Sequence, residues 1–127
     1  MKPLLCCFIL CIVACGVLEE DISDNQIRLM GPSRCAEVPI GIVEFNWEAV
    51  PYALGYEVIL MSPTFNEGRI IADTVLWADT LYRPSYKCQI ELERGIYEWK
   101  VMAFNSGYMT HSEVRTLIVT TSEKLEY

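Results

Sequence analysis

The sequence predicts an all-β domain, built as a sandwich of seven antiparallel strands in two sheets. Short runs of β-branched and aromatic residues alternate with polar residues, and Gly, Pro, Asn and Ser interrupt them about every ten residues. From residue 26 onward, no amphipathic pattern is long enough for a secure helix. Many short strands separated by such turn signals favour two packed antiparallel sheets, with closure into a barrel as the main competitor.

Residue alternation places the individual strands. Val43, Phe45 and Trp47 alternate with polar residues, which predicts a strand with one buried face. The same argument makes Trp99 a core residue, whereas Trp77 could be an exposed aromatic residue on an edge. The predicted strands span residues 26–30, 42–49, 56–60, 69–72, 88–93, 97–103 and 113–120. Residues 74–79 could form an edge strand or a helical turn, so the conformation of residues 73–85 stays open.

The N-terminus has the architecture of a signal peptide. Lys2 precedes an apolar run over residues 4–13, and small residues flank Cys15. The apolar stretch ends at Leu18 after about fifteen residues, whereas a spanning helix needs about twenty. A membrane-spanning anchor is therefore the less favoured interpretation.

Within this leader, Ile12, Val13, Ala14 and Cys15 resemble the lipobox of bacterial lipoproteins. The resemblance implies cleavage before Cys15 and lipid attachment to its sulfur, and several acyl chains make a stable anchor. An ordinary secretory signal cut after Gly16 is the alternative, which would give a freely secreted protein.

The resulting domain organisation has four parts. We expect a signal peptide over residues 1–14, a lipid-anchored acidic tether over 15–25, the sandwich over 26–121 and a C-terminal tail over 122–127. The protein would be exported and held at the cell envelope, on the outer membrane or the cell surface.

The predicted domain contains too few cysteines for a disulfide framework, because four of the six lie in the leader or at its edge. Cys35 and Cys88 could form one bridge. We favour free thiols, because Cys35 lies between the first two strands and Cys88 begins an antiparallel one, which places them toward opposite ends. Cys88 is then a core residue.

Charge narrows the choice of partner. Removing the leader leaves nine basic against seventeen acidic residues, a net charge near −8. Such a surface repels phosphate backbones and anionic headgroups, so we expect no nucleic-acid partner and membrane contact only through the lipid. The same charge favours a soluble, monomeric domain.

Four stretches, in the right order and spacing, resemble parts of a fibronectin type III domain. These are residues 43–58, 92–97, 97–105 and 117–121. Trp47 and Tyr56 match core aromatic residues of that family, and Tyr97 matches the tyrosine of its corner. The resemblance implies an immunoglobulin-like sandwich over about residues 27–121, with Tyr97 hydrogen-bonded across the corner. It implies a scaffold that brings no catalytic residues with it.

The sequence contains no motif typical of a catalytic or metal-binding site. His111 is the one histidine, no nucleophile motif accompanies it, and no zinc or redox cysteine spacing occurs outside the leader. We therefore predict no enzymatic activity, no cofactor and no metal, and take His111 as an exposed loop residue.

Two functions from different classes remain. The first is a surface-anchored module that binds a protein or glycan through its loops, with Tyr108 and Met109 as the best candidates and Tyr52 beside them. The second is a structural accessory subunit that pairs a strand edge with a larger assembly. A contiguous aromatic patch at the loop end would favour the first, and an apolar uncovered edge strand the second.

Overall fold

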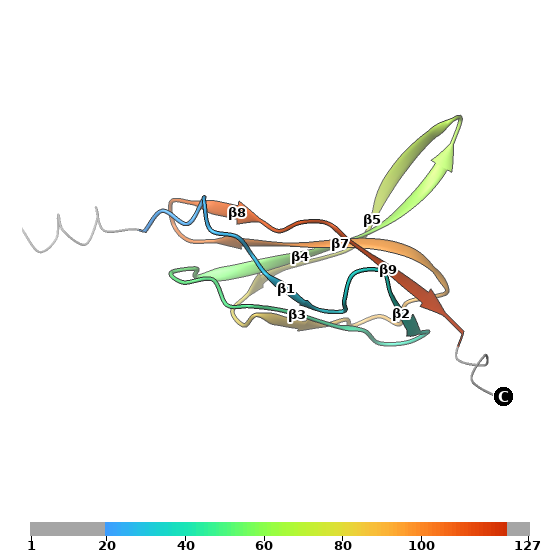
Figure 1. The fold of residues 1–127 in the computed structure, drawn as a ribbon, viewed down its shortest axis with the longest axis horizontal. Coiled ribbons are helices and arrows are strands. Elements are labelled where there is room, and N and C mark those ends of the chain that lie inside the picture. The colour runs from blue at the N-terminus through green and yellow to red at the C-terminus, as the bar shows by residue number, and fades with distance from the viewer. Residues whose placement is uncertain (1–19, 122–127) are drawn as a thin grey trace, which may run out of the picture.

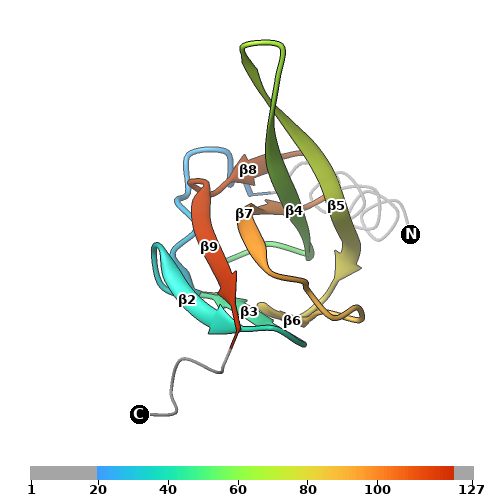
Figure 2. The ribbon, with the colours of Figure 1, turned by 90° about the vertical axis from the view of Figure 1, so that its right-hand side faces the viewer.

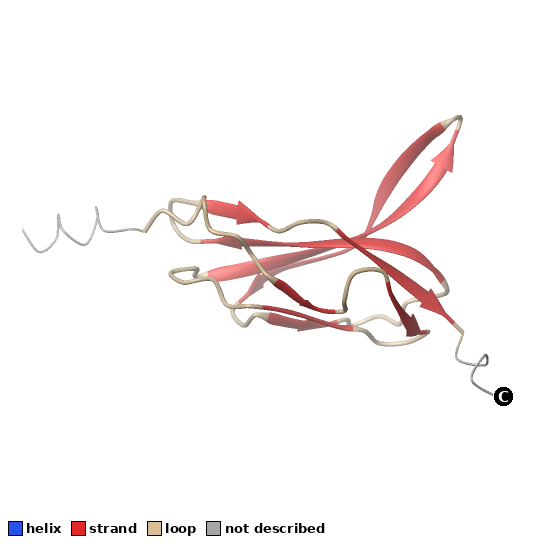
Figure 3. Ribbon diagram, viewed as in Figure 1, coloured by secondary structure: helices blue, strands red, loops and turns tan. Residues whose placement is uncertain are grey.

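The computed structural model describes residues 20–121. The predicted signal peptide, Cys15, the first part of the tether and the C-terminal tail lie outside this range. Within it the chain forms strands and loops and no helix, which confirms the all-β class (Figure 3). The strands are β1 (Leu29–Gly31), β2 (Ala36–Pro39), β3 (Glu44–Trp47), β4 (Gly55–Asn66), β5 (Arg69–Leu81), β6 (Ser85–Lys87), β7 (Gly95–Phe104), β8 (Met109–His111) and β9 (Arg115–Thr120).

The strands form two sheets, as the sequence predicted (Figures 1 and 2). One sheet has the order β1-β3-β6, and the other has the order β2-β9-β7-β4-β5 with β8 paired to β7. All pairs are antiparallel except β2 and β9, which run parallel from Ala36 opposite Leu117 to Pro39 opposite Thr120. The prediction of purely antiparallel strands is therefore wrong at this edge, where the short β2 was not foreseen.

The core lies between the sheets and is built from the residues that alternation placed there. Trp47 and Trp99 are almost completely buried. The rings of Phe45 and Trp99 lie 4.8 Å apart, and those of Trp47 and Tyr56 meet edge to face at 5.4 Å. In the described part of the chain, both indole Nε1 atoms are buried without a hydrogen-bond partner. These tryptophans therefore stabilise the core through packing alone.

Two tyrosines also carry hydrogen bonds. The Tyr97 hydroxyl donates to the Glu93 carbonyl oxygen at 2.8 Å, which confirms the bond predicted across the corner. Burial raises the pKa of Tyr97, so the hydroxyl stays protonated and able to donate. The Val50 amide donates to the Tyr56 hydroxyl at 2.9 Å, which holds the loop after β3 against the core.

The strand predicted over residues 88–93 lies three residues earlier, in β6. Pairing with β3 ends where Glu44 meets Lys87. Beyond that point Cys88 and Leu92 stay buried, but Ile90 turns outward and is 44% exposed. Alternation along the predicted strand would place Ile90 on the same inward face as Cys88 and Leu92, and this is wrong because the ladder that imposes alternation has ended.

β5 covers most of the region 73–85 that the sequence left open, since residues 69–81 form one continuous strand against β4. Two irregularities interrupt the pairing. Val75 is an extra residue between the pairs of Leu76 and Thr74, and Thr80, with φ at 56°, lies in a second shift near the end of the strand. Such bulges increase twist and interrupt an edge.

Candidate binding surfaces

Four exposed apolar side chains gather where the loop between β3 and β4 meets the turn between β7 and β8. Tyr52 and Leu54 come from the first loop and are 67% and 60% exposed. Tyr108 ends the turn, and Met109 begins β8 opposite Phe104. We call Tyr52, Leu54, Tyr108 and Met109 the loop-end patch.

Asn105 holds this end together. Its side-chain oxygen accepts hydrogen bonds from the amides of Gly107 and Tyr108, at 3.1 and 2.9 Å. Its amide nitrogen donates to the carbonyl oxygens of Glu20, at 2.8 Å, and Tyr52, at 3.3 Å. One buried side chain therefore joins the turn, the loop and the incoming N-terminal segment.

The N-terminal segment belongs to the domain from Glu20 onward. Ile22 is fully buried, and the Thr110 hydroxyl donates to the Asn25 carbonyl oxygen at 2.6 Å. The predicted tether over residues 15–25 is therefore wrong for residues 20–25, while residues 15–19 lie outside the described range. Acidic composition suggested a solvated segment, but one apolar side chain and two long-range hydrogen bonds fasten it to the sandwich.

The sequence named three of the four residues of the patch, and the structure places all three at one end. Met109 lies in strand β8 and not in a loop, which corrects its predicted setting. Leu54 and Asn105 were missed as site residues. An asparagine before Ser-Gly is a signal for a side chain that caps its own turn, and it could have pointed to Asn105.

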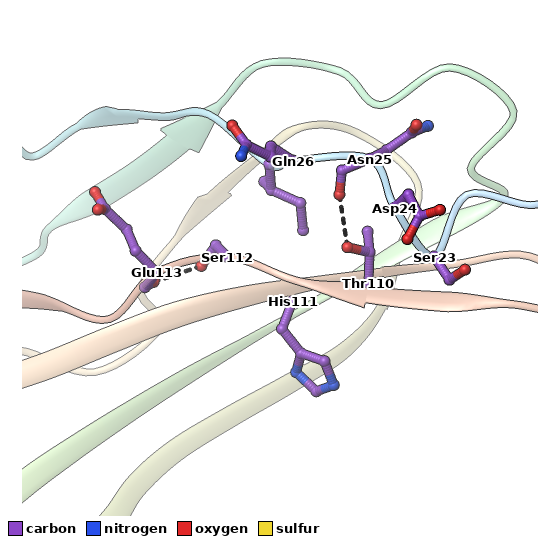
Figure 4. A pocket seen from close by; sticks show the side chains of 9 residues that line it. Ser23, Asp24, Asn25, Gln26, Thr110, His111, Ser112 and Glu113 are labelled. Atoms are coloured by element: carbon purple, nitrogen blue, oxygen red, sulfur yellow. Dashed lines mark hydrogen bonds between the residues drawn. The ribbon is translucent and has the colours of Figure 1, made fainter.

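His111 also lies in β8, which corrects its expected loop position. It borders a groove of about 520 Å³ between the N-terminal segment and β8 (Figure 4). Thr110 and Ser112 point toward that segment, whereas the His111 ring points to the other side of the strand (Figure 4). Among residues 20–121, the His111 ring makes no hydrogen bond or ion pair with a carboxylate, and these residues contain no cluster of metal-ligating side chains.

The carboxylate nearest to His111 in sequence is already engaged. Glu113 pairs with Arg34 at 2.8 Å and with Arg115 at 2.9 Å. The hydrogen bond from Arg115 holds the pKa of Glu113 below its usual range. A general base oriented by an acid is therefore not assembled in this groove.

Both cysteines of the domain are free thiols, one exposed and one buried. Cys35 donates its backbone amide to Thr116 in one sheet, and Cys88 donates its own to Val43 beside the other. The disulfide that could join Cys35 and Cys88 is thus not formed. Cys88 is the core residue that the sequence predicted.

A second surface is the hairpin of β4 and β5, which projects beyond the sandwich (Figures 1 and 2). β4 pairs with β7 only as far as Met61 opposite Glu98, whereas its pairing with β5 continues through Ser62 and Asp73 to the turn. We call residues 62–73 the arm. Two strands without further support are marginally stable in water.

The arm exposes apolar side chains on an open edge. Ile70 is 75% exposed and Ile71 is also exposed, and Val75 is exposed just beyond the arm. β5 is the last strand of its sheet in the described chain, so its outer edge has no partner strand. Farther along this edge, Trp77 is 59% exposed, as expected of an edge aromatic residue, and its indole nitrogen donates to Glu57 at 2.8 Å.

No family model and no curated protein matches the chain. Among solved structures, it is similar to the fibronectin type III domain of human fibronectin type III domain containing protein 3. That match has 17% identity, covers 86% of this chain and 97% of that domain, and has a TM-score of 0.50. The fold is that of a fibronectin type III domain. A Fn3-like protein from Clostridium thermocellum aligns at 20% identity over 75% of this chain and 93% of its own, with a TM-score of 0.49.

At 17% identity this similarity shows the fold alone, and one fold serves many functions. In residues 20–121 there is no helix with the length and hydropathy to cross a membrane.

Proposed function

We propose that this chain is a non-enzymatic exported binding module, anchored at the membrane through lipid on Cys15, which binds a partner protein through the arm. The observation that carries the proposal is the open edge of β5 with Ile70 and Ile71 exposed on it. An extended segment of a partner can add to such an edge through backbone hydrogen bonds, while the exposed side chains select the partner.

The edge is most accessible on the arm itself. Toward the body, the irregularities at Val75 and Thr80 interrupt the strand, and bulges of this kind protect edges from pairing. Residues 69–74 carry one Arg and one Asp and are otherwise apolar or neutral. This segment pairs with β4 without a register shift and carries a low net charge, and both features favour the addition of another strand.

The anchor rests on the match of Ile12–Cys15 to a lipobox and on an apolar leader shorter than a membrane span. Mass spectrometry of the mature N-terminus tests it. The expected species begins at Cys15 and carries diacylglycerol and an acylated amino group, whereas an unmodified chain beginning at Val17 would mean free secretion.

The loop-end patch is a second proposed contact surface, with Tyr108, Met109 and Tyr52 as its contact residues and Leu54 added to them. It is supported by the clamp of Asn105, which holds both loops before any ligand arrives. Aromatic side chains on a preorganised loop contribute contact area at low entropic cost. The sequence alone suggested a protein or a glycan as its ligand.

Partner binding through the arm is tested by photo-crosslinking on intact cells from a reactive residue at Arg69. Once a partner is captured, Ile70→Asp is compared with Ile90→Asp, which changes an exposed isoleucine away from the arm. We expect Ile70→Asp to weaken binding at least about tenfold, equivalent to about 1.4 kcal/mol, with an unchanged melting temperature. Equal affinity of both variants would remove the arm from the interface.

A further inference from the structure

We propose that the loop-end patch lies against the membrane surface to which the chain is anchored, so that its ligand is the apolar part of the lipid interface. The inference rests on the proposed anchor at Cys15. It assigns the two surfaces of the domain to different tasks, with the patch facing the lipid and the arm facing away from it.

The proposed anchor and the patch are joined by a short stretch of chain. The carbonyl oxygen of Glu20 accepts a hydrogen bond from Asn105, the residue that also binds the backbones of Tyr52 and Tyr108. Four residues, 16–19, separate Cys15 from Glu20. At about 3.5 Å per residue, this connection spans at most about 18 Å. The clamp therefore keeps the loop end close to the lipid.

The side chains of the patch suit a lipid interface. Tyrosine is enriched where membranes meet water, because its ring is apolar and its hydroxyl remains hydrated. Leu54 and Met109 add flexible, exposed apolar groups at the same end of the sandwich. Tyr52 has a φ of 67°, a left-handed conformation uncommon for a residue with a side chain, and its ring is exposed. The loop thus presents a large apolar group that does not pack on its own core.

Charge defines the kind of lipid contact. Glu20, Asp21 and Asp24 are exposed at and just after the point where Asn105 binds the N-terminal segment, so this end repels anionic headgroups. The contact is therefore apolar, and added salt should not release it. The proposal extends the sequence-based expectation, which allowed membrane contact through the lipid anchor alone.

The arm points away from the patch. β4 runs from Gly55 beside the patch to Asn66 at the arm turn, twelve residues or about 40 Å of strand. The described chain begins at the end that carries β8, and the arm projects from the other end (Figure 1). A patch held at the membrane consequently presents the free edge of β5 to partners in the aqueous phase.

The test measures the depth of two sites on the full mature protein, purified from membranes and reconstituted into phosphatidylcholine vesicles. Gly107→Cys beside the patch and Glu67→Cys at the arm turn each receive an environment-sensitive fluorophore. Both are made with Cys35→Ser, because Cys35 is the exposed thiol of the described domain. Vesicles with brominated acyl chains then quench only fluorophores at the lipid interface.

We expect brominated lipid to quench the label at position 107 and to leave the label at position 67 unchanged. Adding Tyr52→Ser and Leu54→Ser should abolish the quenching at position 107 while the protein still floats with the vesicles. Ile90→Ser is the matched control and should leave the quenching intact. Melting curves of all variants show that the domain remains folded.

Each outcome separates the inference from the proposed function. Protein that floats with vesicles but shows no quenching at position 107 retains its anchor and overturns the membrane contact, returning the patch to a protein or glycan ligand. Protein that does not float overturns both the anchor and the membrane contact. Quenching at position 107 that survives Tyr52→Ser and Leu54→Ser also overturns the assignment, because the patch would then not hold the loop end at the lipid.

Discussion

Replacing Asn105 with alanine tests the clamp on which the loop end depends. The side chain is 8% exposed and makes four hydrogen bonds with donor-acceptor distances from 2.8 to 3.3 Å. A net contribution of about 0.5–1.5 kcal/mol per bond, reduced for the long contact and for carbonyls that regain water, gives a loss of about 2–4 kcal/mol. This is a large part of the 5–15 kcal/mol typical of a small domain.

The assay is thermal unfolding followed by tryptophan fluorescence. For a domain of this size, each kcal/mol shifts the melting temperature by about 4–8 °C, so Asn105→Ala should melt at least about 8 °C lower. Asn25→Ala is the matched control, because the carbonyl of Asn25, and not its side chain, accepts the bond from Thr110. If Asn105→Ala melted within about 4 °C of the parent, the clamp would contribute little and the preorganised loop end would be wrong.

Three further outcomes are expected. Trp47→Ala should cost about 3–5 kcal/mol in unfolding free energy, and a denaturant midpoint close to that of the parent would contradict its core position. Iodoacetamide should modify Cys35 in the folded protein but not Cys88, whose pKa burial raises; mass spectrometry showing both modified would indicate an open core. The ionised Glu113 side chain stabilises the folded domain at pH values above its unfolded-state pKa of about 4.3. This stabilisation is lost as the pH falls through the lowered pKa of Glu113 in the folded state. Glu113→Gln should therefore melt below the parent at neutral pH and match it in acid, and a difference independent of pH would contradict the pairing with Arg115.

Several structural features followed directly from local sequence pattern. A strand with one buried face places every second residue inward, so Phe45 and Trp47 could be assigned to the core without knowing their partners. Ile90 marks the limit of that reasoning, because alternation persists only while a ladder holds the backbone. The pairing of β6 with β3 ends after Lys87, and the tertiary structure, not the local sequence, decides where that pairing ends.

The length and the open edge of the arm could not be predicted from the sequence pattern. Residues 69–72 were predicted as a short strand, and β-propensity indeed favours it, but the extent of β5 to Leu81 follows from pairing with β4. Neither the two shifts in register nor the absence of a third strand beside the arm in the described chain is visible in the sequence. An exposed edge is defined by what the rest of the fold leaves uncovered.

The sequence by itself determined the all-β class, the aromatic core, the tyrosine corner and three of the four apolar residues of the loop-end patch. The class and the core depend on residue type and on a period of two along the chain, whereas the corner was implied by the resemblance to fibronectin type III domains. Only the tertiary structure brought the patch together and fastened the N-terminal segment to it. Asn105 and Glu20 are 85 positions apart, and a hydrogen bond across that separation forms only once both sheets have placed the two backbones side by side.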